Sequence, residues 1–149
     1  MIDRTLSARF RALTLQALDR SGCPFPALPG RVLVVDVARQ RLGLLEAGAL
    51  IFEARVSTAL NGIGGEEGSH RTPPGWHRIH ARIGLGAEPG TVFRSRVDTG
   101  ERWRGEVLEE DLILTRVLTL EGLESGVNQG SGCDSRERTI YLHGTNQEG

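Results

Sequence analysis

Three apolar segments follow one another within residues 31–57, and they constrain the fold more than any other part of the chain. The first, Arg31–Val37, is rich in β-branched residues and suits a strand that is largely buried on both faces. The second and third, Gln40–Leu45 and Ala49–Ser57, are separated by a short reversal in which Gly48 can take positive φ. Because short turns favour pairing between neighbouring strands, this segment predicts an antiparallel meander.

A single helix is expected ahead of these strands. Within Thr5–Arg20, apolar residues recur at three- and four-residue spacing, which is typical of an amphipathic helix, and Thr5 is a candidate N-cap. Prolines and glycines interrupt residues 21–30, which predicts a linker or an extended wrap. We therefore divide the chain into an N-terminal helix and linker, residues 1–30, and one larger domain, residues 31–149.

Short strands and polar loops are expected in the rest of the chain, where many of the 20 glycines lie. A loop at 61–74 precedes the remaining strands, which are predicted at Trp76–Ile83, Asp111–Leu120 and Thr139–Leu142. On the first of them, one face carries Trp76, Arg78, His80 and Arg82. Gly84–Glu110 is expected to be a polar, glycine-containing stretch anchored by Trp103, and Glu121–Arg138 to be a long polar excursion. The pattern predicts a mainly β fold with an N-terminal helix.

Charge and hydropathy exclude several classes of partner. The net charge is −1 with acids and bases interspersed, so nothing favours nucleic acid or an anionic membrane. No segment approaches the ~20 apolar residues that cross a bilayer, so no membrane span is expected. Residues 1–20 carry scattered charges in place of the apolar run of a signal peptide, so we expect no signal peptide in the chain as printed.

Histidines and cysteines give no metal site. His77 and His80 are three residues apart on a predicted strand and point to opposite faces, and His70 and His77 are expected to be solvated. Cys23 and Cys133 form no CxxC pattern, and a disulfide between them stays open.

His143 has the setting of a candidate catalytic residue. It ends the apolar strand Thr139–Leu142 and opens the polar segment Gly144-Thr145-Asn146. A side chain at the end of a rigid strand that faces a loop is a common position for a catalytic group. A purely structural histidine is the alternative.

Four motifs, in order, resemble those of the L,D-transpeptidase (YkuD-like) catalytic domain. Ile140–Thr145 is similar to the family's "IYIHGT", and Thr72–Gly75 with Ile79 resembles its "TPxG…I" element. Residues 121–130 resemble the family's "GLE.G.N.G" excursion, and residues 32–62 resemble the strands that open the family's domain. The resemblance covers the chain from about Arg31 onward and implies a β-sandwich.

The resemblance also implies an activity: a cysteine thiolate attacks a peptidoglycan stem tetrapeptide, releases D-alanine, and passes the acyl group to a second stem or to water. His143 matches the family's general base, and Gly144 the residue whose carbonyl orients the imidazole. Substrate-binding positions are implied at Thr72, Pro74, Gly75 and Thr145. The partners are peptidoglycan stem peptides, with no metal or organic cofactor, and the location is the cell envelope or periplasm.

One element of the family signature is not matched. The signature continues after its first histidine to Ser/Thr-His-Gly-Cys, whereas the printed chain ends at Gly149. The resemblance therefore implies a fragment that lacks the nucleophile and is inactive as printed. Cys133 does not replace it, because it precedes His143 and the carboxylate of Asp134 beside it disfavours a thiolate.

Two alternatives stay open: an inactive module that binds stem peptides, and an unrelated all-β adaptor. Transpeptidation, hydrolysis and lipoprotein attachment are not distinguished by the sequence.

Overall fold

The computed structural model describes residues 3–147, and it is mainly β with one helix and two antiparallel sheets. The chain divides into two compact units. Unit 1 contains residues 1–76 and 122–134, and unit 2 contains residues 77–121 and 135–149. The predicted fold class is confirmed, and the division of the chain at residue 30 stays a prediction.

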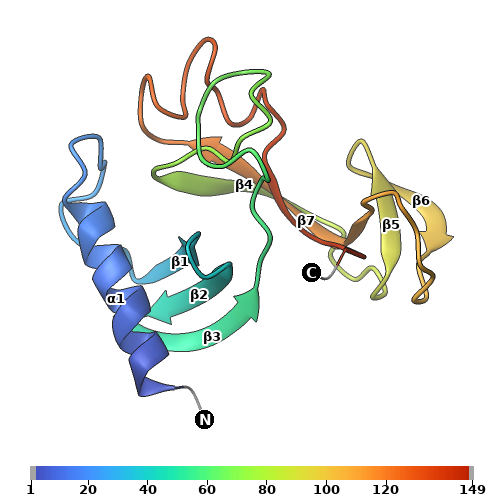
Figure 1. Cartoon of the computed structure of the whole chain (residues 1–149), viewed down its shortest axis with the longest axis horizontal. Helices are drawn as coiled ribbons and strands as arrows, with labels where there is room; N and C mark the ends of the chain where they lie inside the picture. The colour runs from blue at the N-terminus through green and yellow to red at the C-terminus, as the bar shows by residue number, and fades with distance from the viewer. Residues whose placement is uncertain (1–2, 148–149) are drawn as a thin grey trace. The chain divides into compact units, whose positions relative to one another are not determined.

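Helix α1, Arg4–Leu18, covers one face of the first sheet in unit 1 (Figure 1). The N-cap is Asp3, whose carboxylate accepts a hydrogen bond from the backbone N–H of Thr5 at 2.8 Å. The prediction of Thr5 as the N-cap was therefore wrong by two residues, because the carboxylate satisfies an early backbone donor of the helix. Phe10 is fully buried and packs against Leu45 and Leu50.

The predicted meander is confirmed as the sheet β1-β2-β3. Its strands are β1 (Arg31–Asp36), β2 (Arg41–Glu46) and β3 (Ala49–Arg55), each antiparallel to the next. Ala47 and Gly48 at the β2–β3 reversal both have positive φ, of 48° and 80°, as a type I′ turn requires. A Cβ on Gly43 would lie 2.9 Å from the Phe10 ring, so this glycine lets the helix approach the strand.

Burial on both faces of the first strand was a wrong prediction. Val32 and Asp36 are buried, whereas Val35 is 37% exposed, because only one face of the sheet lies under α1. Asp36 is 2% exposed and receives hydrogen bonds from Arg9 Nε at 3.0 Å and the Arg39 backbone N–H at 3.4 Å. The guanidinium of Arg9, which hydrogen-bonds this carboxylate, lowers the pKa of Asp36.

Unit 2 contains the second sheet, in the order β4-β7-β5-β6, with β8 also paired to β7. The strands are β4 (His77–Ile83), β5 (Thr91–Arg94), β6 (Val97–Arg102), β7 (Ile113–Gly122) and β8 (Tyr141–Gly144). Val92, Leu112 and Leu114 form its buried cluster, with Trp103 packed against them as the predicted anchor.

No strand was predicted within the polar stretch Gly84–Glu110, yet β5 and β6 form a hairpin there (Figure 1). Ser95 and Arg96 connect the strands with φ of 49° and 67°, again the geometry of a type I′ turn. This turn could not be predicted from the sequence, because type I′ turns are recognised by Asn-Gly or Asp-Gly and the Ser95-Arg96 pair does not resemble them.

Two further strand starts differ from the prediction. Strand β4 begins at His77, and Trp76 is a buried residue of unit 1 that lies outside the strand. Strand β8 begins at Tyr141, because Thr139 has a φ of 56°, which is incompatible with a strand.

Candidate catalytic site

His143 lies near the end of β8 with an exposed side chain. Its Nδ1 is 2.7 Å from the carbonyl oxygen of Gly144. A carbonyl oxygen can only accept, so Nδ1 donates the hydrogen in this contact. In the neutral ring, Nε2 then holds a lone pair and can accept a proton.

Gly144 is held tightly against strand β7. A Cβ at this position would lie 2.7 Å from the carbonyl oxygen of Leu114, which real Cβ atoms essentially never do. Residue 144 therefore has to be glycine for β8 to pair with β7 as it does, and the same pairing sets the carbonyl that contacts His143.

Thr145, Asn146 and Gln147 are fixed to the segment that precedes β7. Thr145 Oγ1 donates to Asp111 Oδ1 at 2.6 Å and accepts from the Gln147 backbone N–H at 3.0 Å. Asn146 Oδ1 accepts from the Leu112 backbone N–H at 2.7 Å. The polar turn after His143 is thus held by side-chain hydrogen bonds within unit 2.

Thr72 belongs to unit 1 and fixes a loop. Its Oγ1 accepts from the Ala59 backbone N–H at 2.8 Å. Its backbone N–H donates to Gly62 O at 3.0 Å, and its carbonyl accepts from the Gly64 N–H at 2.9 Å. These contacts hold the loop that leads into residues 73–76.

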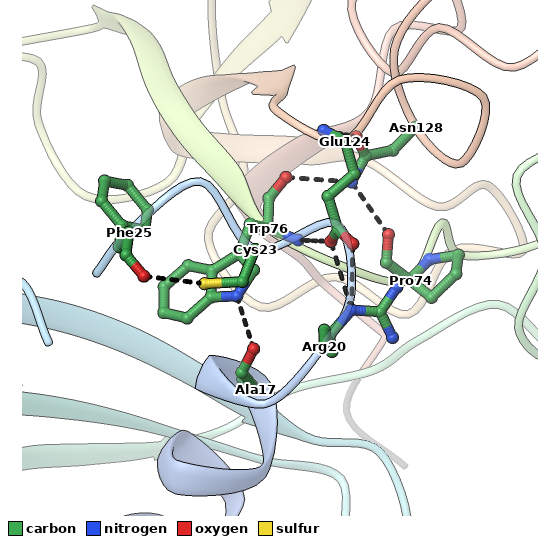
Figure 2. A network of polar contacts seen from close by, with 8 residues as sticks. All are labelled: Ala17, Arg20, Cys23, Phe25, Pro74, Trp76, Glu124 and Asn128. Atoms are coloured by element: carbon green, nitrogen blue, oxygen red, sulfur yellow. Dashed lines mark hydrogen bonds and ion pairs between the residues drawn. The ribbon is translucent and has the colours of Figure 1, made fainter. Parts of the chain in front are cut away.

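Pro74, also in unit 1, borders a buried polar network (Figure 2), and Gly75 follows it in the chain. Asn128 is fully buried, and its Nδ2 donates to the carbonyls of Pro74 at 3.0 Å and Trp76 at 2.9 Å. Its Oδ1 accepts from the Glu124 backbone N–H at 2.9 Å. Gly75 has a φ of 91°, and a Cβ there would lie 2.1 Å from Glu124 Oε2.

The Glu124 carboxylate is the charged centre of this network. It is 2% exposed and accepts from the Trp76 backbone N–H at 2.5 Å and from Arg20 Nε at 3.2 Å (Figure 2). The Trp76 indole N–H donates to Ala17 O at 2.8 Å, and its ring meets the Phe25 ring edge-on at 5.1 Å. Within unit 1 the network connects the end of α1 by hydrogen bonds to residues 72–76, which include the TPPG segment (Thr72–Gly75), and to the excursion of residues 122–134.

The other histidines differ from one another in their surroundings. His77 is half-buried, and its Nε2 lies 2.8 Å from Oγ of Ser135, which is fully buried. The prediction that it is solvated was therefore wrong, because β4 turns its side chain toward Ser135. His70 and His80 are exposed.

Both cysteines carry free thiols and are half-buried. Cys23 Sγ donates to Phe25 O at 3.6 Å, and Cys133 Sγ to Gln129 O at 3.5 Å. Across residues 3–147, no group of three or more His, Cys, Asp and Glu side chains is placed to hold a metal ion. No helix in the same part of the chain is long and apolar enough to cross a membrane.

The predicted site residues fall into two groups, one in each unit. Thr72, Pro74 and Gly75 lie together in unit 1, and His143–Thr145 lie together in unit 2. Sequence reasoning did not single out Glu124 and Asn128, although both stand in the "GLE.G.N.G" excursion that it recognised. Burial of a carboxylate and an amide next to each other was the missing information.

The fold and the site together define a class of protein. It is a mainly β protein in which an exposed histidine near the end of a strand donates a hydrogen bond to the backbone carbonyl of the next residue. The chain belongs to the YkuD family, the L,D-transpeptidase catalytic domain, whose family model matches residues 30–149. This confirms the family resemblance read from the sequence. No curated protein and no solved structure matches the chain.

Proposed function

We propose that this chain is part of a peptidoglycan L,D-transpeptidase in which His143 is the general base. Membership of the family supports the reaction class, and one observation carries the residue assignment. His143 Nδ1 is committed to the Gly144 carbonyl at 2.7 Å, so Nε2 of the exposed ring is the proton acceptor. An ordinary imidazole pKa of ~6.5 and a thiol pKa of ~8.5 are close enough for proton transfer near neutral pH.

The proposed reaction has two halves. Nε2 of His143 takes the thiol proton, and the thiolate attacks the carbonyl after the L-centre of diaminopimelate in a stem tetrapeptide. The tetrahedral intermediate collapses, and D-alanine leaves with the proton from the imidazolium. In the second half His143 deprotonates the side-chain amine of another stem, which attacks the thioester, forms a crosslink and releases the thiol. With water as acceptor the same steps hydrolyse the stem.

We assign the nucleophile to a cysteine in a Ser/Thr-His-Gly-Cys element that follows His143 in the complete protein. Cys133 is a poor substitute, because its thiol already donates to backbone carbonyls and Asp134 follows it directly. We propose Thr72, Pro74, Gly75 and Thr145 as substrate-side positions. Crosslinking of this kind would contribute to cell-wall organisation and cell shape in the cell envelope.

The first test is the coding DNA across and beyond codon 149. We expect an in-frame Ser/Thr-His-Gly-Cys element at the family's spacing. A stop codon directly after Gly149 would contradict the assignment of the nucleophile, and an inactive stem-peptide binding module would then be the better account.

The second test is turnover by the product of the complete coding sequence. Incubated with disaccharide tetrapeptide, it should release D-alanine and give a crosslinked or hydrolysed product by mass spectrometry. A carbapenem should add its mass to the cysteine. His143→Gln should abolish D-alanine release, whereas His80→Gln, an exposed histidine on β4, should not change it. Binding of the tetrapeptide without D-alanine release would contradict the proposed enzymatic function and favour the inactive module that binds stem peptides.

A further inference from the structure

Strand β7 departs from regular pairing directly opposite the candidate base. Leu114 pairs with Gly144, and the next pair along the ladder is Val117 with His143. Thr115 and Arg116 of β7 therefore have no partner residue on β8, although His143 and Gly144 are consecutive. This is a bulge in β7 located at the His143–Gly144 peptide. Bulges bend a strand and re-aim the side chains beside them.

The backbone of this bulge is strained. Thr115 has a φ of 69°, in the left-handed region that a β-branched residue rarely adopts. Among the non-glycine residues with positive φ in the described chain, the β-branched ones are Thr115 and Thr139. Thr115 lies opposite the end of β8, and Thr139 lies just before its start. Such strain persists only where the surroundings impose it, and it gathers at functional sites.

The loop between β4 and β5 holds the bulge in place. Thr115 Oγ1 accepts a hydrogen bond from the Gly90 backbone N–H at 3.0 Å. Arg116 Nη1 donates to the Thr115 carbonyl and to the Ala87 carbonyl, each at 2.7 Å. A Cβ on Gly84 would lie 3.0 Å from the Thr115 carbonyl oxygen, so the loop fits closely against the bulge.

We propose that Thr115 is a positioning residue for His143. By holding the bulge, it fixes the end of β8 at the register in which the Gly144 carbonyl receives Nδ1–H and Nε2 is left to accept a proton. The tight contact of Gly144 with Leu114 O transmits the position of β7 to this carbonyl. The catalytic meaning of this arrangement rests on the proposed function, whereas the positioning itself is a property of unit 2 and can be measured without turnover.

The test reads the ring tautomer of His143 by ¹⁵N NMR at alkaline pH, at which the ¹⁵N shifts themselves report a neutral ring. The His143→Gln variant identifies its signals among the four histidines. The native chain should show the Nδ1–H tautomer. Thr115→Val removes the acceptor for the Gly90 N–H and should give a mixture of tautomers, whereas Thr115→Ser retains the hydroxyl and should keep the native tautomer.

Arg116→Met is the second variant, for the case in which Thr115→Val does not fold. It removes both guanidinium hydrogen bonds while keeping an apolar stem, and it should also give a mixture. A native tautomer in the folded Thr115→Val or Arg116→Met protein would overturn the proposal.

A kinetic measurement on the complete protein separates this proposal from the proposed function. Thr115→Val should lower kcat for D-alanine release about 10–100-fold with KM unchanged, because misplacing a catalytic group by about 1 Å has that effect. If the tautomer changes as expected and even the native protein releases no D-alanine, the enzymatic function fails and the positioning stands. If turnover is native in Thr115→Val, the positioning fails and the enzymatic function stands.

Discussion

The buried amide of Asn128 gives the sharpest stability prediction. Its side chain is fully buried and makes three hydrogen bonds, to Pro74 O, Trp76 O and the Glu124 N–H. The Trp76 carbonyl also accepts from the Leu123 N–H at 3.0 Å, so it keeps a partner when Asn128 is truncated. The Pro74 carbonyl and the Glu124 N–H then lose the partner that the structure gives them.

A buried backbone group left without a partner costs about 1–3 kcal/mol. The Glu124 N–H is buried and the Pro74 carbonyl is partly buried, so Asn128→Ala should lower the free energy of unfolding by about 1–4 kcal/mol. A domain is stable by about 5–15 kcal/mol, so this loss removes a large share of the stability of the fold. Asn128→Leu should cost a similar amount, because it restores most of the volume and none of the hydrogen bonds. A loss caused by the cavity alone would instead be largely recovered in the leucine variant.

The assay is urea unfolding followed by tryptophan fluorescence in a Trp103→Phe background. Trp76 is then the sole tryptophan, and it lies in the network itself. Gln129→Ala, at the exposed neighbouring position, is the matched control and should change the unfolding free energy by less than about 0.5 kcal/mol. If Asn128→Ala costs less than about 1 kcal/mol in the same assay, the reasoning from orphaned backbone groups is refuted.

Three further predictions follow from other parts of the structure. Gly144→Ala places a Cβ 2.7 Å from a β7 carbonyl oxygen, so it should lower the free energy of unfolding in urea by about 1–3 kcal/mol. The β8 amides should also lose protection from hydrogen exchange, and native protection would contradict the assigned contact. Arg9 lowers the pKa of Asp36 in the folded protein. The stabilisation that the Asp36 carboxylate contributes is therefore present above the unfolded-state pKa of ~3.9 and is lost as the pH falls through its lower folded-state pKa. Asp36→Asn should therefore be less stable than the native chain at neutral pH and lose less stability on acidification below about pH 4, measured by urea unfolding at several pH values. Replacing Ser95 and Arg96 together by Asn-Gly should raise the unfolding free energy by about 1–2 kcal/mol, since both positions have positive φ. An unchanged midpoint temperature of thermal unfolding would argue against the type I′ turn.

Local patterning determined the parts of this protein that sequence reasoning placed correctly. The meander of residues 31–57 follows from apolar runs and short reversals, and α1 follows from helical spacing, since both depend on neighbours in the chain. The placement of His143 near the end of a strand likewise follows from the short apolar run before it and the polar segment after it. Family membership was legible for the same reason, because its motifs are short and contiguous.

Tertiary structure alone decided the features in which a residue's conformation is imposed by groups distant in the sequence. The residues next to Thr115 in the sequence do not predict its positive φ. The β4–β5 loop and the register with β8 impose this conformation. Trp76 reads as a strand residue, yet burial against Phe25 and the Glu124 carboxylate takes it out of β4. Asn128 reads as a loop residue, and only the return of the 122–134 excursion to the TPPG segment makes it a buried three-way hydrogen-bond centre. These features are non-local contacts, which periodicity and turn chemistry do not encode.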